Sequence, residues 1–154
     1  MPNWCKGTLR IHGLKKNLQK FVLEGLQPVD LLGEDLDKLK LDEDGDIEYQ
    51  SKPYDCWIKG TYRGFVSFNE VWFSGYKDDV PITIAMDAQF AWGIDATELQ
   101  KACKEYGIDM RIYAFEQGME FNQNIEILNG IITKDENLKF DDYIWDCICP
   151  NIGG

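Results

Sequence analysis

The residues best suited to chemistry in this 154-residue chain are carboxylates gathered in one segment. Residues 27–56 contain ten Asp and Glu against three Lys. An acidic stretch around a glycine can bind Ca²⁺, but placing Gly45 at the sixth position of an EF-hand loop puts Lys40 first and Ser51 last. Those two positions must supply carboxylates, and the last is normally a bidentate Glu. We therefore interpret the stretch as a solvated acidic loop that holds no metal.

The cysteines offer a second kind of chemistry. They are Cys5, Cys56, Cys103, Cys147 and Cys149. One residue separates the last two, whereas zinc sites and thioredoxin-like sites use two, and the single histidine leaves no second ligand pair. We expect reduced thiols, several of them buried as small apolar side chains, with no metal and no cofactor.

His12 is the one side chain that ordinarily titrates near neutral pH. A hydrolytic triad would also need a Ser or Cys nucleophile on a recognisable turn, and the sequence shows none. It also shows no glycine-rich loop that would hold phosphates. These absences predict a protein that is not an enzyme.

Residues 61–68, TYRGFVSF, overlap the main signature of RNA-recognition domains. The second half of the signature matches, whereas the first half lacks one stacking aromatic. The companion strand, LRIHGL, has Arg10 where an aromatic belongs. A sheet face of Arg and aromatic side chains could still stack on bases and contact phosphates. The residues of this nucleic-acid alternative are Arg10, Arg63, Arg111 and Tyr113.

The net charge of −11 argues against generic nucleic-acid binding, because phosphates repel an acidic chain. Clustered carboxylates can instead imitate a phosphate backbone and occupy the basic groove of a nucleic-acid-binding protein. This is the leading hypothesis: a non-enzymatic module that binds a protein partner, expected to be basic. Its residues are Asp35, Asp37, Asp42, Glu43, Asp44, Asp46 and Glu48.

Two helices and several strands must position these side chains. Residues 6–12 alternate between apolar and polar, as in a half-buried strand, with Cys5 on the side of Leu9. Residues 14–26 then repeat with helical period and stop near Gly25. Asp95 is a good N-cap for a second helix that ends at Gly107. Asn129-Gly130 predicts a tight hairpin.

Residues 1–154 are expected to form a single domain, because the length and the 44% hydrophobic content suit one core. Residues 27–55 form an acidic insertion or loop compatible with a short helix over 31–39, and residues 135–154 form a C-terminal extension. The order of elements predicts an α+β, ferredoxin-like βαββαβ core, mainly antiparallel, with two helices on one face and a C-terminal β-meander. With neither an apolar span nor a signal peptide, a cytoplasmic protein is expected.

The opening residues resemble the YubB family of phage- and plasmid-borne proteins. The resemblance rests on Pro2-Asn3-Trp4-Cys5 with Leu9-x-Ile11-x-Gly13, on Phe90–Trp92, and on Tyr113 with Glu116-x-Gly118-x-x-Phe121. It covers the first strand and helix and roughly residues 88–128. The chain has Gly93-Ile94-Asp95 where the family usually continues after Trp with x-x-Pro-Pro. The resemblance implies a ferredoxin-like domain carried on mobile DNA, and it implies no reaction.

Overall fold

The computed structural model describes residues 2–49 and 56–139. Within these ranges, short helices and longer strands follow one another along the chain. The elements are β1 (Trp4–Leu14), α1 (Lys15–Lys20), a π-helical turn η1 (Phe21–Gly25), β2 (Leu26–Pro28), β3 (Ile47–Glu48), β4 (Cys56–Ile58), β5 (Gly64–Ser67), β6 (Glu70–Val71), β7 (Pro81–Ala91), α2 (Ala96–Tyr106), β8 (Asp109–Glu116), β9 (Phe121–Leu128) and β10 (Ile131–Lys139).

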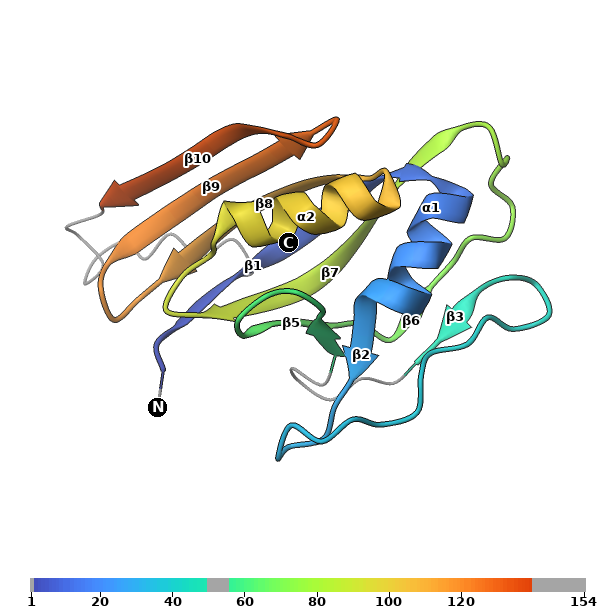
Figure 1. Cartoon of the computed structure of the whole chain (residues 1–154), viewed down its shortest axis with the longest axis horizontal. Coiled ribbons are helices and arrows are strands. Elements are labelled where there is room, and N and C mark those ends of the chain that lie inside the picture. Colours follow the sequence, from blue (N-terminus) through green and yellow to red (C-terminus); the bar gives the residue numbers. More distant parts are fainter. Residues whose placement is uncertain (1, 50–55, 140–154) are drawn as a thin grey trace.

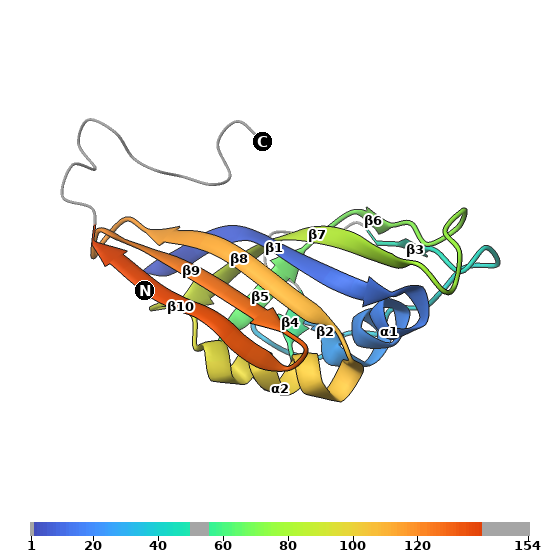
Figure 2. The ribbon, with the colours of Figure 1, turned by 90° about the horizontal axis from the view of Figure 1, so that it is seen from above.

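Eight strands form one antiparallel sheet in the order β10-β9-β8-β1-β7-β5-β4-β2. Figure 1 shows α1 and α2 in front of this sheet, and the perpendicular view in Figure 2 places both on the same face. Strands β3 and β6 pair separately, close to α1. The hydrophobic core therefore lies between the helices and one face of the sheet.

Strand β1 is central because one set of its alternating side chains is apolar. Cys5, Leu9 and Ile11 are fully buried on the helix side, whereas Arg10 is exposed on the opposite face. The strand pairs with β7 along its whole length and with β8 along most of it. The predicted strand and the predicted buried thiol are both confirmed. Burial raises the pKa of Cys5 to about 12, and the charge of Glu116 adds to the shift.

The predicted ends of the second helix and the predicted hairpin turn are also confirmed. Helix α2 begins after Asp95, whose carboxylate accepts the backbone N–H of Thr97 at 2.8 Å, and ends at Gly107 in the left-handed conformation (φ 64°). Asn129 and Gly130 both have positive φ and connect β9 to β10 as predicted. Each signal acts within a few residues, so tertiary packing has little scope to override it.

The first helical segment is short. Six residues of α1 lead into the turn η1, which ends at Gly25 where the sequence predicts a stop. Phe21 in this turn is fully buried and packs edge-on against Tyr106 of α2, with ring centroids 5.5 Å apart. Neither helix in the described ranges is long and apolar enough to cross a membrane.

The predicted fold class is wrong. The chain forms a largely β structure, dominated by an eight-stranded antiparallel sheet, and not a two-helix ferredoxin-like α+β fold. Residues 26–28, which were not expected to form a strand, pair as β2 with β4 and widen the sheet on one side, while β9 and β10 widen it on the other. The short helix that the sequence allowed over 31–39 is also absent: Leu31 and Leu32 lie in a turn, and Asp35 pairs with Val29 in an isolated bridge.

Candidate protein-interaction surface

The acidic segment, defined here as residues 29–48, follows edge strand β2 and runs along the margin of the molecule to β3 (Figure 1). Its first part is a closed turn. The carboxylate of Asp30 accepts the backbone N–H groups of Leu32 and Glu34, each at 2.8 Å, and Val29 bridges to Asp35. This part of the segment is therefore a fixed loop and not a freely moving chain.

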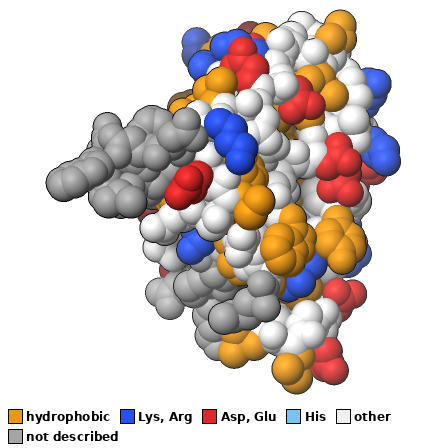
Figure 3. Space-filling model, turned by 90° about the vertical axis from the view of Figure 1, so that its left-hand side faces the viewer, with side chains coloured by type: hydrophobic (Ala, Val, Ile, Leu, Met, Phe, Trp, Pro, Cys, Tyr) orange, Lys and Arg blue, Asp and Glu red, His pale blue; other side chains and the backbone are white. Residues whose placement is uncertain are grey.

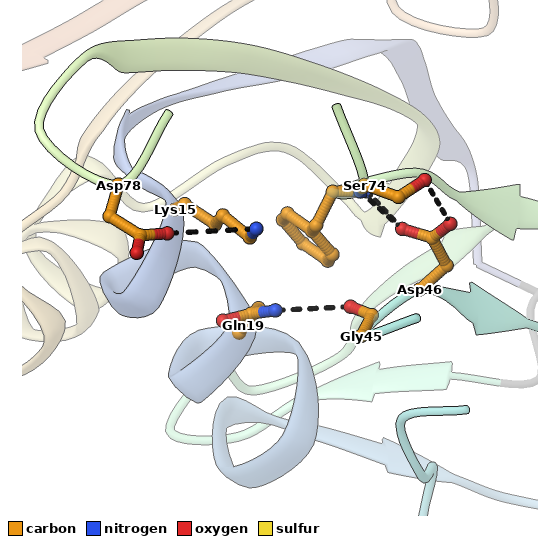
Figure 4. A network of polar contacts seen from close by, with 7 residues as sticks. Lys15, Gln19, Gly45, Asp46, Ser74 and Asp78 are labelled. Atoms are coloured by element: carbon orange, nitrogen blue, oxygen red, sulfur yellow. Dashed lines mark hydrogen bonds and ion pairs between the residues drawn. The ribbon is translucent and has the colours of Figure 1, made fainter. Parts of the chain in front are cut away.

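The second part is built around Asp42 and Asp46. Asp42 accepts the backbone N–H groups of Asp44 and Asp46, each at 2.9 Å. Asp46 in turn accepts the hydroxyl of Ser74 at 2.5 Å and the backbone N–H groups of Phe73 and Ser74 at 2.5 and 2.6 Å. Figure 4 shows this contact, together with the bond from Gln19 of α1 to the carbonyl of Gly45 at 3.0 Å. Asp42 and Asp46 are thus occupied in building the loop.

Asp46 links this loop to stability in a pH-dependent way. The hydroxyl of Ser74, followed by its backbone N–H, holds the pKa of Asp46 below its usual value. A lowered folded-state pKa stabilises the protein above the unfolded-state pKa, and that stabilisation is lost as the pH falls through the folded value. Asp46→Asn is therefore expected to be less stable than the wild type at pH 7, with the difference shrinking below about pH 4.

Urea unfolding at pH 7 and at pH 3 measures this difference. Asp44→Asn is the matched control, because its exposed side chain accepts no hydrogen bond within the described residues. It should follow the wild type at both pH values. A stability loss in Asp46→Asn that is equal at both pH values would contradict the role of the charged carboxylate.

The other predicted binding carboxylates point into solvent. Asp35, Asp37, Glu43, Asp44 and Glu48 are all exposed. Between described residues, ion pairs join Lys15 to Asp78 at 3.6 Å and Arg111 to Glu126 at 3.7 Å, and none involves the acidic segment. The seven carboxylates selected from the sequence therefore divide into two that shape the backbone and five that remain available to a partner.

Within residues 2–49 and 56–139, no three His, Cys, Asp or Glu side chains are arranged to hold a metal ion. The pair Cys147 and Cys149 lies outside the described residues. His12 donates to or accepts from the hydroxyl of Thr83 at 2.8 Å, and it lines a pocket of about 470 Å³ with Asp109 and Lys104. Asp109 in this pocket accepts the backbone N–H of Asn129.

The residues of the nucleic-acid alternative do not form one patch. Arg10 and Arg111 are directly opposite on β1 and β8, and Tyr113 is the next residue along that face. Arg63 lies over the ring of Trp4, 5.4 Å from its centroid, and its carbonyl accepts the N–H of Ala91. Ala91 is six residues from the partner of Arg10 on β7, a separation of about 20 Å.

The strand order also separates the RNA-recognition signature in TYRGFVSF from its companion strand LRIHGL. Strand β7 lies between β5, which carries Phe65, and β1. Phe65 reaches only the end of β1, where its ring meets Trp4 edge-on at 6.1 Å. The guanidinium of Arg111 is engaged by Glu126. Within the described residues, Arg63 therefore lies apart from the other three side chains of this alternative, and one of the remaining arginines is paired with a glutamate.

Sequence reasoning missed two groups of exposed apolar residues. Leu31 and Leu32 at the tip of the first acidic turn are 91% and 86% exposed. At the opposite end of the sheet, Trp92 has positive φ (69°) and is exposed, and its N–H is bonded to Asn3. Figure 3 views this end and shows apolar side chains close to basic ones. Two adjacent leucines before a glycine in an acidic stretch were the available signal for the first group.

Comparisons with known proteins give this chain no relative. No protein-family model matches it, and neither the curated proteins nor the solved structures contain a match. The resemblance of the opening residues to the YubB family therefore stays a prediction.

Proposed function

We propose that this protein is a non-enzymatic interaction module that binds a basic surface of another protein through the acidic segment. One observation carries the proposal: hydrogen bonds accepted by Asp30, Asp42 and Asp46 fix the backbone of the segment, while its other carboxylates are exposed and have no cationic partner among the described residues. A pre-shaped acidic surface steers a basic partner and needs little ordering when it binds.

The proposal also concerns where the protein acts and which proteins it meets there. A cytoplasmic protein carried by a phage or plasmid, as the resemblance to the YubB family implies, would meet nucleic-acid-binding proteins of its host. Such proteins present basic grooves that clustered carboxylates can occupy in place of phosphates. Binding of nucleic acid by the sheet face receives less support, because Arg63 lies far from Arg10 and a glutamate engages Arg111.

An affinity pull-down tests the proposal with the triple variant E43Q/D44N/E48Q. The wild type should recover a basic protein. The complex should dissociate as the salt concentration rises from about 0.1 to 1 M, because the screening length of charge interactions falls from about 10 to about 3 Å. The triple variant should bind that protein about tenfold more weakly, because each exposed charge pair contributes a fraction of a kcal/mol.

The matched control is E120Q/D135N/E136Q, which removes three exposed charges from the β8–β9 turn and from β10. It changes the net charge equally and should bind like the wild type. Equal weakening by both triple variants would show that net charge alone matters. Unchanged binding by E43Q/D44N/E48Q would refute a role for the acidic segment.

A further inference from the structure

The tip of the first acidic turn presents two leucines almost completely to water. Leu31 and Leu32 are 91% and 86% exposed, and Leu36, just after the turn, is half exposed. Isolated exposed leucines are ordinary in folded proteins. Two neighbouring ones at this exposure form a compact apolar knob, which a protein partner could bury completely.

The loop that carries these leucines is held in one shape. Besides the two bonds to the carboxylate of Asp30, the N–H of Asp30 bonds the carbonyl of Glu34 at 2.9 Å, and the N–H of Leu36 bonds Pro28 at 2.9 Å. The buried amide of Gln27 donates to the carbonyls of Pro28 and Leu36, each at 3.0 Å. The loop is thereby joined to β2, so binding would order few additional groups.

The charges around the leucines define what kind of protein they fit. Residues 30–37 contain four carboxylates and no Lys or Arg. Glu34, Asp35 and Asp37 are exposed beside the leucines. An apolar pocket rimmed by Lys and Arg is complementary to this arrangement, whereas a second copy of the tip would bring like charges together.

We propose that Leu31 and Leu32 are the apolar anchor of the acidic surface and insert together into an apolar pocket on the basic partner protein. Glu34, Asp35 and Asp37 then pair with Lys and Arg at the rim of the pocket. This anchor rests on the proposed function. It means that the partner is recognised by apolar contact as well as by charge. Anchors that fill a pocket at the centre of an interface dominate its affinity, and rim charges mainly set its rate of association.

Photo-crosslinking from the tip tests the geometry. The full chain with benzoylphenylalanine at position 31 is irradiated in bacterial cells, next to a control with the same group at position 128, an exposed leucine of β9. Position 31 should form a crosslink to a second protein, at an apolar peptide flanked by Lys or Arg, and position 128 should not. A crosslinked dimer of this chain, equal products from both positions, or an attachment site without basic neighbours would overturn the inference.

Affinity measured with the partner that the crosslink identifies separates the anchor from the charges. L31S/L32S should weaken binding about 30-fold without changing its dependence on salt. The control L128S/L138S makes the same chemical change at exposed sites in β9 and β10 and should bind like the wild type. Circular dichroism checks that both variants fold.

The outcomes distinguish the two proposals. If L31S/L32S binds like the wild type while E43Q/D44N/E48Q binds weakly, the anchor is wrong and the acidic function stands. If neither variant weakens binding, both are wrong. Weak binding by L31S/L32S together with a lost salt dependence would also contradict the anchor, because the leucines carry no charge.

Discussion

Gly7→Ala is expected to lower the free energy of unfolding by about 3 kcal/mol, at the upper end of the usual cost of overpacking. Gly7 lies in the centre of β1, where the backbone of β8 passes unusually close. A methyl group there would stand 2.5 Å from the carbonyl oxygen of Tyr113 and 3.0 Å from the Cα of Ala114. Both are backbone atoms of a paired strand, so they cannot move aside without opening the ladder between β1 and β8.

Urea unfolding measures the effect, and Gly60→Ala is its control. Gly60 has φ of 86° but nothing within 4 Å of the added methyl group, so its substitution costs only the left-handed backbone conformation, roughly 1–2 kcal/mol. Gly7 does not have a left-handed conformation, so the stability lost in Gly7→Ala comes from crowding alone. If Gly7→Ala were no more destabilising than Gly60→Ala, the close approach of β1 and β8 would be wrong.

Phe21→Ala is expected to cost about 4 kcal/mol, because it removes a fully buried ring and leaves a cavity. The ring occupies the seam where η1 meets α2: it packs against Tyr106, and it lies within 3 Å of where a side chain on Gly25 would begin. Main-chain atoms of a short turn can close such a space only in part. The loss should therefore approach the full value for a buried aromatic residue.

Tyr62→Ala is the control for Phe21→Ala, since it removes an aromatic ring that is 76% exposed. It should change the free energy of unfolding by less than about 0.5 kcal/mol, as is usual for surface substitutions. A loss below about 1 kcal/mol in Phe21→Ala, measured with an unchanged urea slope, would mean that the two helical segments do not share this contact.

Short-range sequence signals predicted the elements well. The alternation through Leu9 and Ile11 identified β1, and Asp95 and Gly107 identified both ends of α2, because each pattern is decided by its nearest neighbours. The Asn129-Gly130 turn is a case of the same kind. Strand alternation, helix caps and tight turns depend on residues close in sequence, so they form whatever packs against them.

The arrangement of the elements could not be predicted in the same way. Three residues such as Leu26–Pro28 carry too little pattern to reveal a strand, yet their pairing with Cys56–Ile58 widens the sheet and changes the fold class. The order that places β7 between β1 and β5 depends on contacts between distant parts of the chain. No local feature of TYRGFVSF shows that its neighbour in the sheet is residues 81–91.

Composition located the candidate surface, but it could not show which of its carboxylates shape the loop and which are available to a partner. Asp42 and Asp44 are the same residue type two positions apart and are both exposed, and only the folded loop shows that Asp42 accepts backbone N–H groups whereas Asp44 accepts none within the described residues. The same limit hid Leu31 and Leu32. Leucines at helical spacing suggest burial, but residues 31–39 form no helix, and Leu31 and Leu32 are exposed in a turn.

The position of β1 in the sheet has a consequence for how the protein forms during synthesis. Strand β1 is paired on both sides, and both partners are synthesised well after it: Leu14 faces Pro81, and Lys6 faces Phe115. Closing loops of this length costs conformational entropy before the strands that they join can form stabilising contacts. Folding is therefore slow, and we expect it on the order of milliseconds to seconds. The apolar side chains of β1 therefore stay uncovered on the growing chain until β8, about 100 residues later, has also been synthesised.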